Sequence, residues 1–422
     1  MKSLQKFLSG IALLSSAFLG FANKSFSQQT TTTLETILAK PHVKEILSHQ
    51  VYVPKMNGRI IYVDDDNTTG TGTLEDPYNK IQRAIDNAVD GDEIIVEQGR
   101  YLENININGK NIILRSTNPT DPNIIAETII DGNQAGSVVT FSGNESTSCT
   151  LEGLTITNGK AATGGGIDGG GTSTNATVQN NIIFGNTAYH IIVYNPPHGQ
   201  SYSIPNGKGG GICLCEGAIQ NNIIYGNQSN KSGGGLYGCN GLIQNNLVSN
   251  NSSDDMGGGI DFCLGTIQNN LVVRNSAGRG GGIANSSTIK GNTIYGNFGG
   301  GVESGGLTNN IIWGNFGYQV INDYVIASYS DIQDWTQGGV GNISLDPQFV
   351  DSINGDYHLR PYSPCIDAGM TIENLLTDIE NNPRGIKGVL EQRGDGSNYD
   401  IGAVEYNPSK SVVDSKIWEM YE

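Results

Sequence analysis

The chain has 422 residues, enough for one large domain or two ordinary ones, and 59 of them are glycine. Lysine plus arginine number 24 against 41 for aspartate plus glutamate, so the formal net charge is −17. This balance argues against binding of nucleic acid, and we expect no nucleic-acid partner. An acidic polymer would need a bridging metal ion or a local basic groove.

The N-terminus has the pattern of a signal peptide. Lys2 and Lys6 precede an apolar run at residues 7–21, and Ser25 and Ser27 are spaced for cleavage after Ser27. The run is short for a membrane span, and no later stretch is apolar enough to cross a bilayer. We expect residues 1–27 to be removed and the chain to be secreted, or held at the cell surface, without a transmembrane segment. An uncleaved anchor helix is the alternative.

The next segments lead into a repeat. Residues 28–57 are expected to be a linker with one short helix, and residues 58–91 to hold a strand and a capping helix. Within residues 78–89, Ile81, Ala84, Ile85 and Ala88 fall on one helical face. An amphipathic helix at this position predicts a lid over the first unit of whatever follows.

Residues 92–350 repeat a short unit. Residues 209–227, 233–251 and 257–275 are near copies that start 24 residues apart. Glycine triplets begin at 164, 209, 233, 257, 280 and 299. Two asparagine columns follow the triplets, at Asn181, Asn222, Asn246, Asn270, Asn292 and Asn310, and at Asn186, Asn227, Asn251, Asn275, Asn297 and Asn315.

The repeat predicts a solenoid of β-coils with three strands per turn. Its apolar segments are too short and too broken by glycine for helices. A unit of this size buries its apolar side chains only by stacking on its neighbours, so we expect Ile219, Ile243 and Ile267 in one buried stack. The strands would pair in parallel about 4.8 Å apart, and the asparagines would form hydrogen-bonded ladders.

Three stretches resemble known families. Residues 61–105 resemble the start of secreted right-handed parallel β-helix proteins of the pectin-lyase-like superfamily, and the repeats resemble those of polymorphic outer-membrane proteins. Residues 344–369, with DIGAVEY at 400–406, resemble the C-terminal segment of bacterial choice-of-anchor Q proteins. The resemblance implies an all-β, single-stranded right-handed parallel β-helix over residues 92–350. Residues 351–406 would close its C-terminal end, and residues 407–422 would be a tail.

Resemblance to pectate lyases also orients the coil. It places the first asparagine column at the bend between the second and third strands, so the turn before each glycine triplet would border a substrate groove. The insertion at 189–208 falls in that turn and carries Tyr189, His190 and His198, a wall for sugars or a solvated loop. The candidate substrate-binding residues are Tyr194, Tyr202, Tyr237, Asp168 and Glu303.

Acidic and basic residues near this groove suggest chemistry. Asp254, Asp255 and Asp261 are candidate Ca²⁺ ligands, since calcium takes carboxylate oxygens from flexible loops. Arg279 and Arg274 are candidate catalytic bases of the pectate lyase type, which takes a proton from the sugar. The same carboxylates would also suit the acid and base pair of a glycoside hydrolase, or they are solvated acids without a site.

The six cysteines lie at 149, 213, 215, 239, 263 and 365. Cys215, Cys239 and Cys263 follow the 24-residue period, so they should stack in one column, where adjacent coils come within disulfide range. Structural stacking is favoured over a redox or metal role.

Three functions stay open. The first is a non-catalytic, monomeric surface protein that binds a polysaccharide or another cell-surface partner. The second is an enzyme, either a calcium-dependent polysaccharide lyase or a glycoside hydrolase. The third is a structural spacer. We favour the first, because no catalytic motif is visible.

Overall fold

The computed structural model describes residues 33–49, 58–68, 70–171, 173–189, 191–195, 200–204, 207–321 and 325–409. The chain divides into two compact units, residues 1–40 and 41–422. In the first, the helix α2 (Leu34–Leu38) begins after Thr33, whose hydroxyl oxygen accepts from the amide of Thr36 at 3.4 Å. The expected signal peptide lies outside the described residues. Within these ranges no helix is long and apolar enough to cross a membrane.

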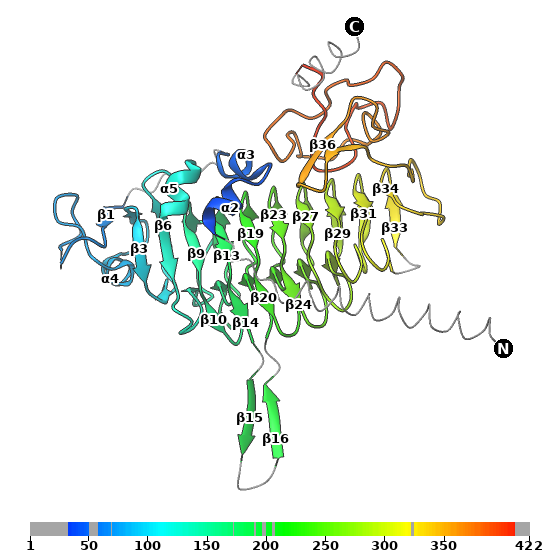
Figure 1. The fold of residues 1–422 in the computed structure, drawn as a ribbon. Coiled ribbons are helices and arrows are strands. Elements are labelled where there is room, and N and C mark those ends of the chain that lie inside the picture. The colour runs from blue at the N-terminus through cyan, green and yellow to red at the C-terminus, as the bar shows by residue number, and fades with distance from the viewer. Residues whose placement is uncertain are drawn as a thin grey trace, which may run out of the picture. The chain divides into compact units, whose positions relative to one another are not determined.

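Three parallel sheets run along the second unit and wind into a β-helix (Figure 1). Sheet A contains, in spatial order, β1 (Ile60–Val63), β2 (Glu93–Val96), β5 (Ile113–Ser116), β8 (Thr150–Glu152), β12 (Thr177–Gln179), β18 (Ile219–Gln220), β22 (Ile243–Gln244), β26 (Thr266–Gln268), β29 (Thr288–Lys290), β31 (Gly306–Thr308) and β33 (Ile326–Ser328). Sheet B contains β3 (Gly99–Leu102), β6 (Thr128–Asp131), β9 (Thr155–Thr157), β13 (Ile182–Phe184), β19 (Ile223–Tyr225), β23 (Leu247–Ser249), β27 (Leu271–Val273), β30 (Thr293–Tyr295), β32 (Ile311–Trp313) and β34 (Asp331–Ile332).

Sheet C holds the strand that follows each glycine triplet. Its strands are β4 (Ile105–Asn106), β7 (Val139–Thr140), β11 (Ile167–Asp168), β17 (Ile212–Cys213), β21 (Leu236–Tyr237), β25 (Ile260–Asp261) and β28 (Ile283–Ala284). A short sheet D adds β10 (Lys160–Ala161), β14 (Thr187–Ala188), β20 (Gln228–Ser229) and β24 (Ser252–Ser253) to four coils. The expected fold class, an all-β parallel β-helix with three sheets, is confirmed.

The core is a set of apolar stacks along the coil. Ile219 pairs with Ile243, Ile243 with Ile267 and Ile267 with Ile289, and all four are fully buried. Because the strands pair in register, each repeat places the same side chain above its equivalent. The inward assignment from the 24-residue period is confirmed.

Both asparagine columns form buried ladders. The Asn222 Nδ2 donates to Asn246 Oδ1 at 3.0 Å, and the Asn227 Nδ2 donates to Asn251 Oδ1 at 3.0 Å. The first column lies between sheets A and B, and the second follows sheet B. Each carboxamide thereby satisfies its own hydrogen bonds and those of the bend beneath it.

The glycine triplet makes a corner too tight for side chains. Gly257 has φ +59°, and a Cβ there would lie 2.4 Å from the Cβ of Asp261. A Cβ on Gly258 would lie 2.4 Å from the carbonyl oxygen of Ser276. The corner therefore brings the turn before each triplet against the outward side chains of sheet C.

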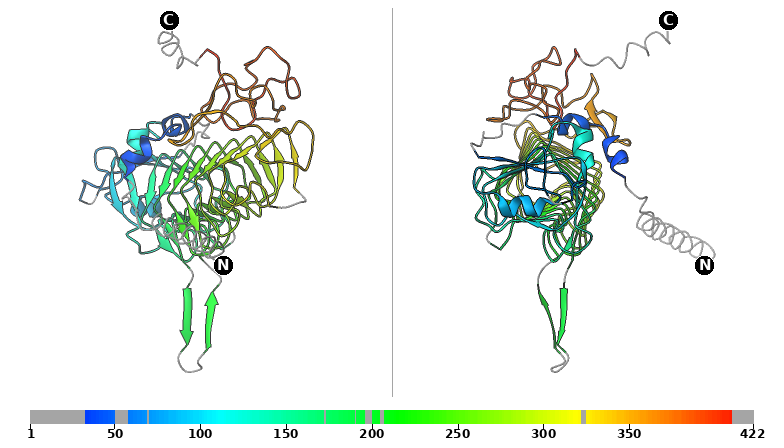
Figure 2. Two further views of the ribbon diagram at one scale, coloured as in Figure 1. Left: turned by 45° about the vertical axis from the view of Figure 1, so that its right-hand side comes forward. Right: turned by 90° about the vertical axis from the view of Figure 1, so that its left-hand side faces the viewer.

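Different elements cover the two ends of the core. The helix α4 (Ile81–Asn87) buries Ile81, Ala84 and Ile85 and lies over the first coils, as expected of a lid (Figure 2). At the other end Trp335 packs against the core just after β34. The insertion forms an antiparallel hairpin, β15 (Ile191–Asn195) with β16 (Gln200–Ile204), that leaves the coil.

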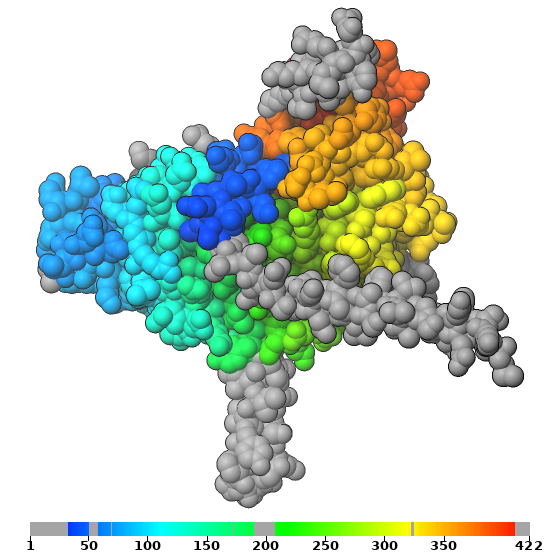
Figure 3. Space-filling model, viewed as in Figure 1, coloured from blue at the N-terminus to red at the C-terminus, as the bar shows by residue number. Residues whose placement is uncertain are grey.

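The C-terminal segment lies on the flank of the coils. It begins with the antiparallel pair β35 (Phe349–Asp351) and β36 (Asp356–Leu359) and continues without regular structure to residue 406. The Asn309 Nδ2 donates to Met370 O at 2.6 Å, and the Asn269 Nδ2 donates to Thr377 O at 3.2 Å. The segment therefore rests on the bends between sheets A and B, whereas we expected residues 351–406 to close the last coil (Figure 3).

The same flank carries two short helices, α3 (Val43–Leu47) and α5 (Pro122–Glu127). Asn180 donates to the carbonyl oxygen of Leu47 at 3.2 Å and to that of His49 at 2.7 Å. The residue before each ladder asparagine, such as Asn269 and Asn309, has a left-handed backbone. Where this residue is Asn180, Asn269 or Asn309, its carboxamide donates to the covering segments and holds them in place.

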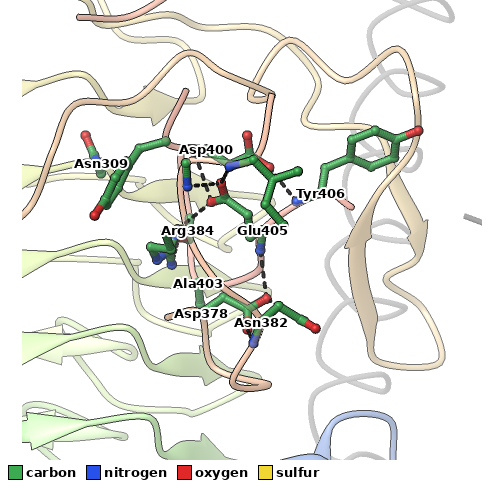
Figure 4. Close-up of polar contacts among 12 residues, drawn as sticks. Asn309, Asp378, Asn382, Arg384, Asp400, Ala403, Glu405 and Tyr406 are labelled. Carbon is green, nitrogen blue, oxygen red and sulfur yellow. Dashed lines mark hydrogen bonds and ion pairs between the residues drawn. The ribbon is translucent and has the colours of Figure 1, made fainter. Parts of the chain in front are cut away.

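A buried polar cluster holds the C-terminal segment together (Figure 4). The Arg384 guanidinium lies 3.1 Å from Glu405 Oε2, and the Glu405 amide donates to Asp378 Oδ2 at 3.0 Å. The Tyr406 amide donates to Asp400 Oδ2 at 2.6 Å. Burial, and then the Glu405 charge, raise the pKa of Asp400 well above its usual range. The DIGAVEY motif is thus explained by internal contacts that fix the segment.

Candidate functional site

One column of outward residues crosses sheet C. Asp168 pairs with Cys213, Cys213 with Tyr237, Tyr237 with Asp261 and Asp261 with Ala284. A bridge between Ile283 and Val302 continues the stack, so Glu303 follows Ala284. The structure thus brings four of the sequence-predicted site residues, Asp168, Tyr237, Asp261 and Glu303, into one line.

A second column borders the first. Five of the six residues just before the glycine triplets pair in parallel, in the order Thr163, Lys208, Ser232, Met256 and Arg279, whereas the sixth, Phe298, pairs with Ser276. We call the two columns together, with the residue that follows each outward residue, the sheet C face. Its geometry repeats, because the tight corner folds each turn onto the strand that follows.

An aromatic pair lies in the middle of the sheet C face. The Tyr237 and Phe262 rings stack with centroids 6.0 Å apart and planes at 16°. The Lys208 ammonium donates to the Tyr237 hydroxyl at 2.8 Å and lies 4.5 Å from the ring centroid. Phe262 is 47% exposed and has φ +54°, a left-handed conformation that costs a phenylalanine energy. Leu214, Gly238 and Asn285 are left-handed at the same place in the neighbouring coils, so the repeat sets this conformation.

Arg279 is held in an ion pair. Its guanidinium lies 2.6 Å from Glu303 Oε1, and the Arg279 side chain is half exposed while Glu303 is buried. The Tyr318 hydroxyl accepts from the Gly280 amide at 2.9 Å and also contacts Arg279. Burial, and less strongly the Glu303 charge, raise the pKa of Tyr318. The Glu303 Oε2 is buried without a partner among the described residues.

Asp261 lies deep in the corner. It is 3% exposed, and its Oδ1 accepts from Asn285 Nδ2 at 2.9 Å. Burial raises the pKa of Asp261, and the Glu303 charge adds to that rise, while hydrogen bonds from Asn285 and Ser232 oppose it. Asp168, three coils earlier, accepts from the Thr163 hydroxyl at 2.7 Å.

Asp254 and Asp255 lie in the turn before Met256. Both are exposed, and their amides donate to Ser229 O and Lys231 O at 3.3 and 2.9 Å. Their carboxylates are not part of any group, within the described ranges, whose three ligand atoms lie within 4.8 Å of one another. The structure therefore does not gather them with Asp261 into a formed metal site.

One predicted residue, Arg274, lies away from this face. Arg274 follows β27 in sheet B, where its guanidinium donates to Ser352 O at 2.9 Å and to Ile353 O. It anchors the β35–β36 turn there, so Arg279 is the arginine on the sheet C face. Tyr194 and Tyr202 belong to β15 and β16, whose side chains, like His190 and His198, lie outside the described structure.

Sequence reasoning missed four residues on or beside this face. Lys208, Phe262, Asn285 and Tyr318 each contact a residue that had been singled out. Lys208 and Ser232 each precede a glycine triplet and reach the outward residue 29 positions later. The place of Lys208 directly before a glycine triplet was the sequence signal that could have found it.

The cysteines are all free and buried. The Cys239 amide donates to Cys263 Sγ at 3.3 Å, so the two stack in the core as the period predicted. Burial raises the pKa of the Cys215 thiol, as it does those of Cys149 and Cys239. Neutral thiols in an apolar stack act as packing residues.

No family model matches the sequence, and no curated protein matches it. Among solved structures the chain is similar to the pectate lyase Pel9A, with 15% identity over 84% of this chain and 98% of that one and a TM-score of 0.47. It is similar to a PL6 alginate lyase in complex with a trisaccharide, with 17% identity over 84% and 72% and a TM-score of 0.35. A complex of XylC with xylose shares 10% identity over 79% and 99%, with a TM-score of 0.35.

Proposed function

We propose that the protein binds a polysaccharide along the sheet C face without cleaving it. The observation that carries the proposal is the stacked pair of Tyr237 and Phe262, in which Phe262 is 47% exposed and Lys208 lies over the Tyr237 ring. Aromatic rings present apolar faces to sugar rings, while Lys208 and Arg279 offer charge to sugar carboxylates. The ligand class is an acidic glycan, met outside the cell by a monomer if the signal peptide acts as expected.

The state of Arg279 favours binding over catalysis. A catalytic base must give up its proton before it takes one from the sugar. The Glu303 carboxylate at 2.6 Å stabilises the charged guanidinium, so Arg279 serves better as a carboxylate clamp.

Cleavage of an acidic polysaccharide is the second candidate. The observation in its favour is the pair of buried carboxyl groups, Asp261 and Glu303, on either side of the small residue Ala284. Burial raises the pKa of Asp261, which suits a proton donor. A spacer role is the third candidate and needs no ligand.

The proposed Ca²⁺ ligands are Asp254, Asp255 and Asp261. The exposed turn with Asp254 and Asp255 would have to close over the corner that holds Asp261 for one ion to meet all three. We expect uronan affinity to fall when calcium is chelated and in Asp261→Asn. Equal affinity with and without chelator would remove calcium from the proposal.

The test is a glycan array followed by calorimetry on each hit. We expect an acidic glycan to bind, and Phe262→Ala to weaken binding at least tenfold. Tyr362→Ala is the control, because Tyr362 is an exposed aromatic residue of the C-terminal segment, outside the sheet C face. Absorbance of unsaturated products and release of reducing ends, measured on the same glycans, would reveal cleavage. If no glycan binds, the spacer role is the candidate function that remains.

A further inference from the structure

Two histidines and a glutamate converge outside the sheet C face. His42 lies just before α3, His358 in β36 and Glu380 in the irregular part of the C-terminal segment. One ligand atom of each lies within 4.8 Å of the other two, and no other such group of histidine, cysteine, aspartate or glutamate occurs in the described part of the chain. Segments more than 300 residues apart in sequence meet here.

The three side chains are already oriented toward one another. The Glu380 carboxylate lies between the imidazoles, with Oε1 2.6 Å from His42 Nδ1 and Oε2 3.0 Å from His358 Nε2. The two rings lie 4.7 Å apart at 30°. His42 has a fully buried side chain and a left-handed backbone with φ 69°. A fixed ring and a fixed carboxylate lower the cost of gathering ligands around an ion.

The outer side of His358 has a further feature of metal sites. Asp356 Oδ1 lies 2.7 Å from His358 Nδ1, the nitrogen that faces away from Glu380. A carboxylate on the outer nitrogen of a ligating histidine fixes its tautomer and raises its basicity. The His358 side chain is 42% exposed, which leaves an open side for an ion to enter and for a water ligand.

We propose that His42, His358 and Glu380 bind one divalent transition-metal ion of the zinc class. Two imidazole nitrogens and one carboxylate oxygen suit zinc, whereas calcium and magnesium take oxygen ligands. Three protein ligands leave the fourth position of a tetrahedral ion to water. The ion would tie the segment around α3 to the C-terminal segment and stabilise both on the flank of the coil.

Metal loading requires a peptide to turn and protons to move on both histidines. The Tyr357 amide donates a hydrogen bond to His42 Nε2 at 3.1 Å. In the metal-free chain the His42 proton therefore sits on Nδ1. An ion on Nδ1 moves that proton to Nε2, where it faces the Tyr357 N–H. The peptide before Tyr357 must therefore turn, and His358 gives up its Nε2 proton to solvent.

The test is zinc titration of the full chain by calorimetry, with thermal unfolding measured in parallel. We expect one zinc ion per chain and a higher unfolding midpoint. His358→Gln and Glu380→Gln should each weaken zinc binding more than a hundredfold. Asp356→Asn, which leaves all three ligands in place, should weaken it about 10–100-fold.

Glu373→Gln is the matched control, since Glu373 is an exposed glutamate of the same C-terminal segment outside the group. Circular dichroism checks that each variant keeps the β-helix. The proposal is overturned if the folded chain takes up no zinc saturably, or if zinc binds the His358→Gln and Glu380→Gln variants as tightly as the parent, which would place the ion elsewhere.

Discussion

The carboxamides of Asn246 and Asn270, one coil apart, are joined by a hydrogen bond of 3.0 Å from Nδ2 to Oδ1. The Asn270 Oδ1 also accepts from the Asn246 amide at 2.9 Å. One carboxamide oxygen therefore accepts hydrogen bonds from both the backbone amide and the side chain of the asparagine in the coil before it. This contact recurs along the stack and fixes the bend on which the C-terminal segment rests.

Substituting one ladder member should destabilise the whole coil. Asn246→Ala removes the acceptor for the buried amide and Nδ2 of Asn222, at 2.9 and 3.0 Å. A buried unsatisfied donor costs about 1–3 kcal/mol, so we expect a loss on the order of 2–4 kcal/mol in unfolding free energy. Guanidinium unfolding measures it. Asn354→Ala at an exposed turn is the control, and an equal effect of both would contradict the ladder's role.

A core substitution tests the apolar stack. Ile243→Ala should cost about 2–5 kcal/mol, because Ile219 above and Ile267 below hold the cavity open. Ile326→Ala is the matched control, since Ile326 lies in the same sheet but is 80% exposed, and we expect less than about 0.5 kcal/mol there. The guanidinium midpoints of the two variants decide the matter. An unshifted midpoint in Ile243→Ala would refute the buried stack.

The repeat made the coil predictable, because a fixed period places equivalent residues above one another whatever the turns do. Ile219, Ile243 and Ile267 follow from that rule alone. The C-terminal segment has no period, so its place depends on single contacts, such as Asn309 with Met370, that no pattern announces. Its position on the flank therefore could not be predicted from the sequence.

The candidate site was predictable only in part. The outward column with Tyr237, Asp261 and Glu303 follows from the period. Arg274 and Arg279 differ by five positions, yet the bends between them place one beside sheet B and the other on the sheet C face. The approach of His42 to Glu380 joins residues 338 positions apart, so a single sequence gives no sign of it.

Glu152 should make stability depend on pH. Burial raises the pKa of Glu152 to about 7, above its ordinary value of 4.5. Glu152 therefore loses its proton at lower pH in the unfolded chain than in the folded one. Its contribution to folding stability is largest below about pH 4.5 and falls toward pH 7, by about 3 kcal/mol at full effect. Glu152→Gln should remove this decline in thermal midpoints measured from pH 4 to 8. The exposed Glu391→Gln should leave it, and a decline unchanged in Glu152→Gln would refute the assignment.

The ion pair on the sheet C face separates stability from binding. Arg279→Gln leaves the buried Glu303 without its cation, so we expect a loss of about 1–3 kcal/mol in unfolding free energy and weaker binding of an acidic glycan. The double variant Arg279→Gln with Glu303→Gln should recover stability but not affinity. Urea unfolding and calorimetry measure the two effects. Affinity that recovers together with stability would show that Arg279 does not touch the ligand.

Hydrogen exchange with a bound glycan locates the ligand most directly. Backbone amides of the full chain are followed by mass spectrometry with and without a saturating acidic oligosaccharide from the array. We expect slower exchange in the turns that border β17, β21, β25 and β28, above all at residues 254–257, 262–265 and 277–280. Exchange in the C-terminal segment around the exposed Tyr362 should not change. Protection confined to another flank, or no protection at saturation, would contradict a binding surface on the sheet C face.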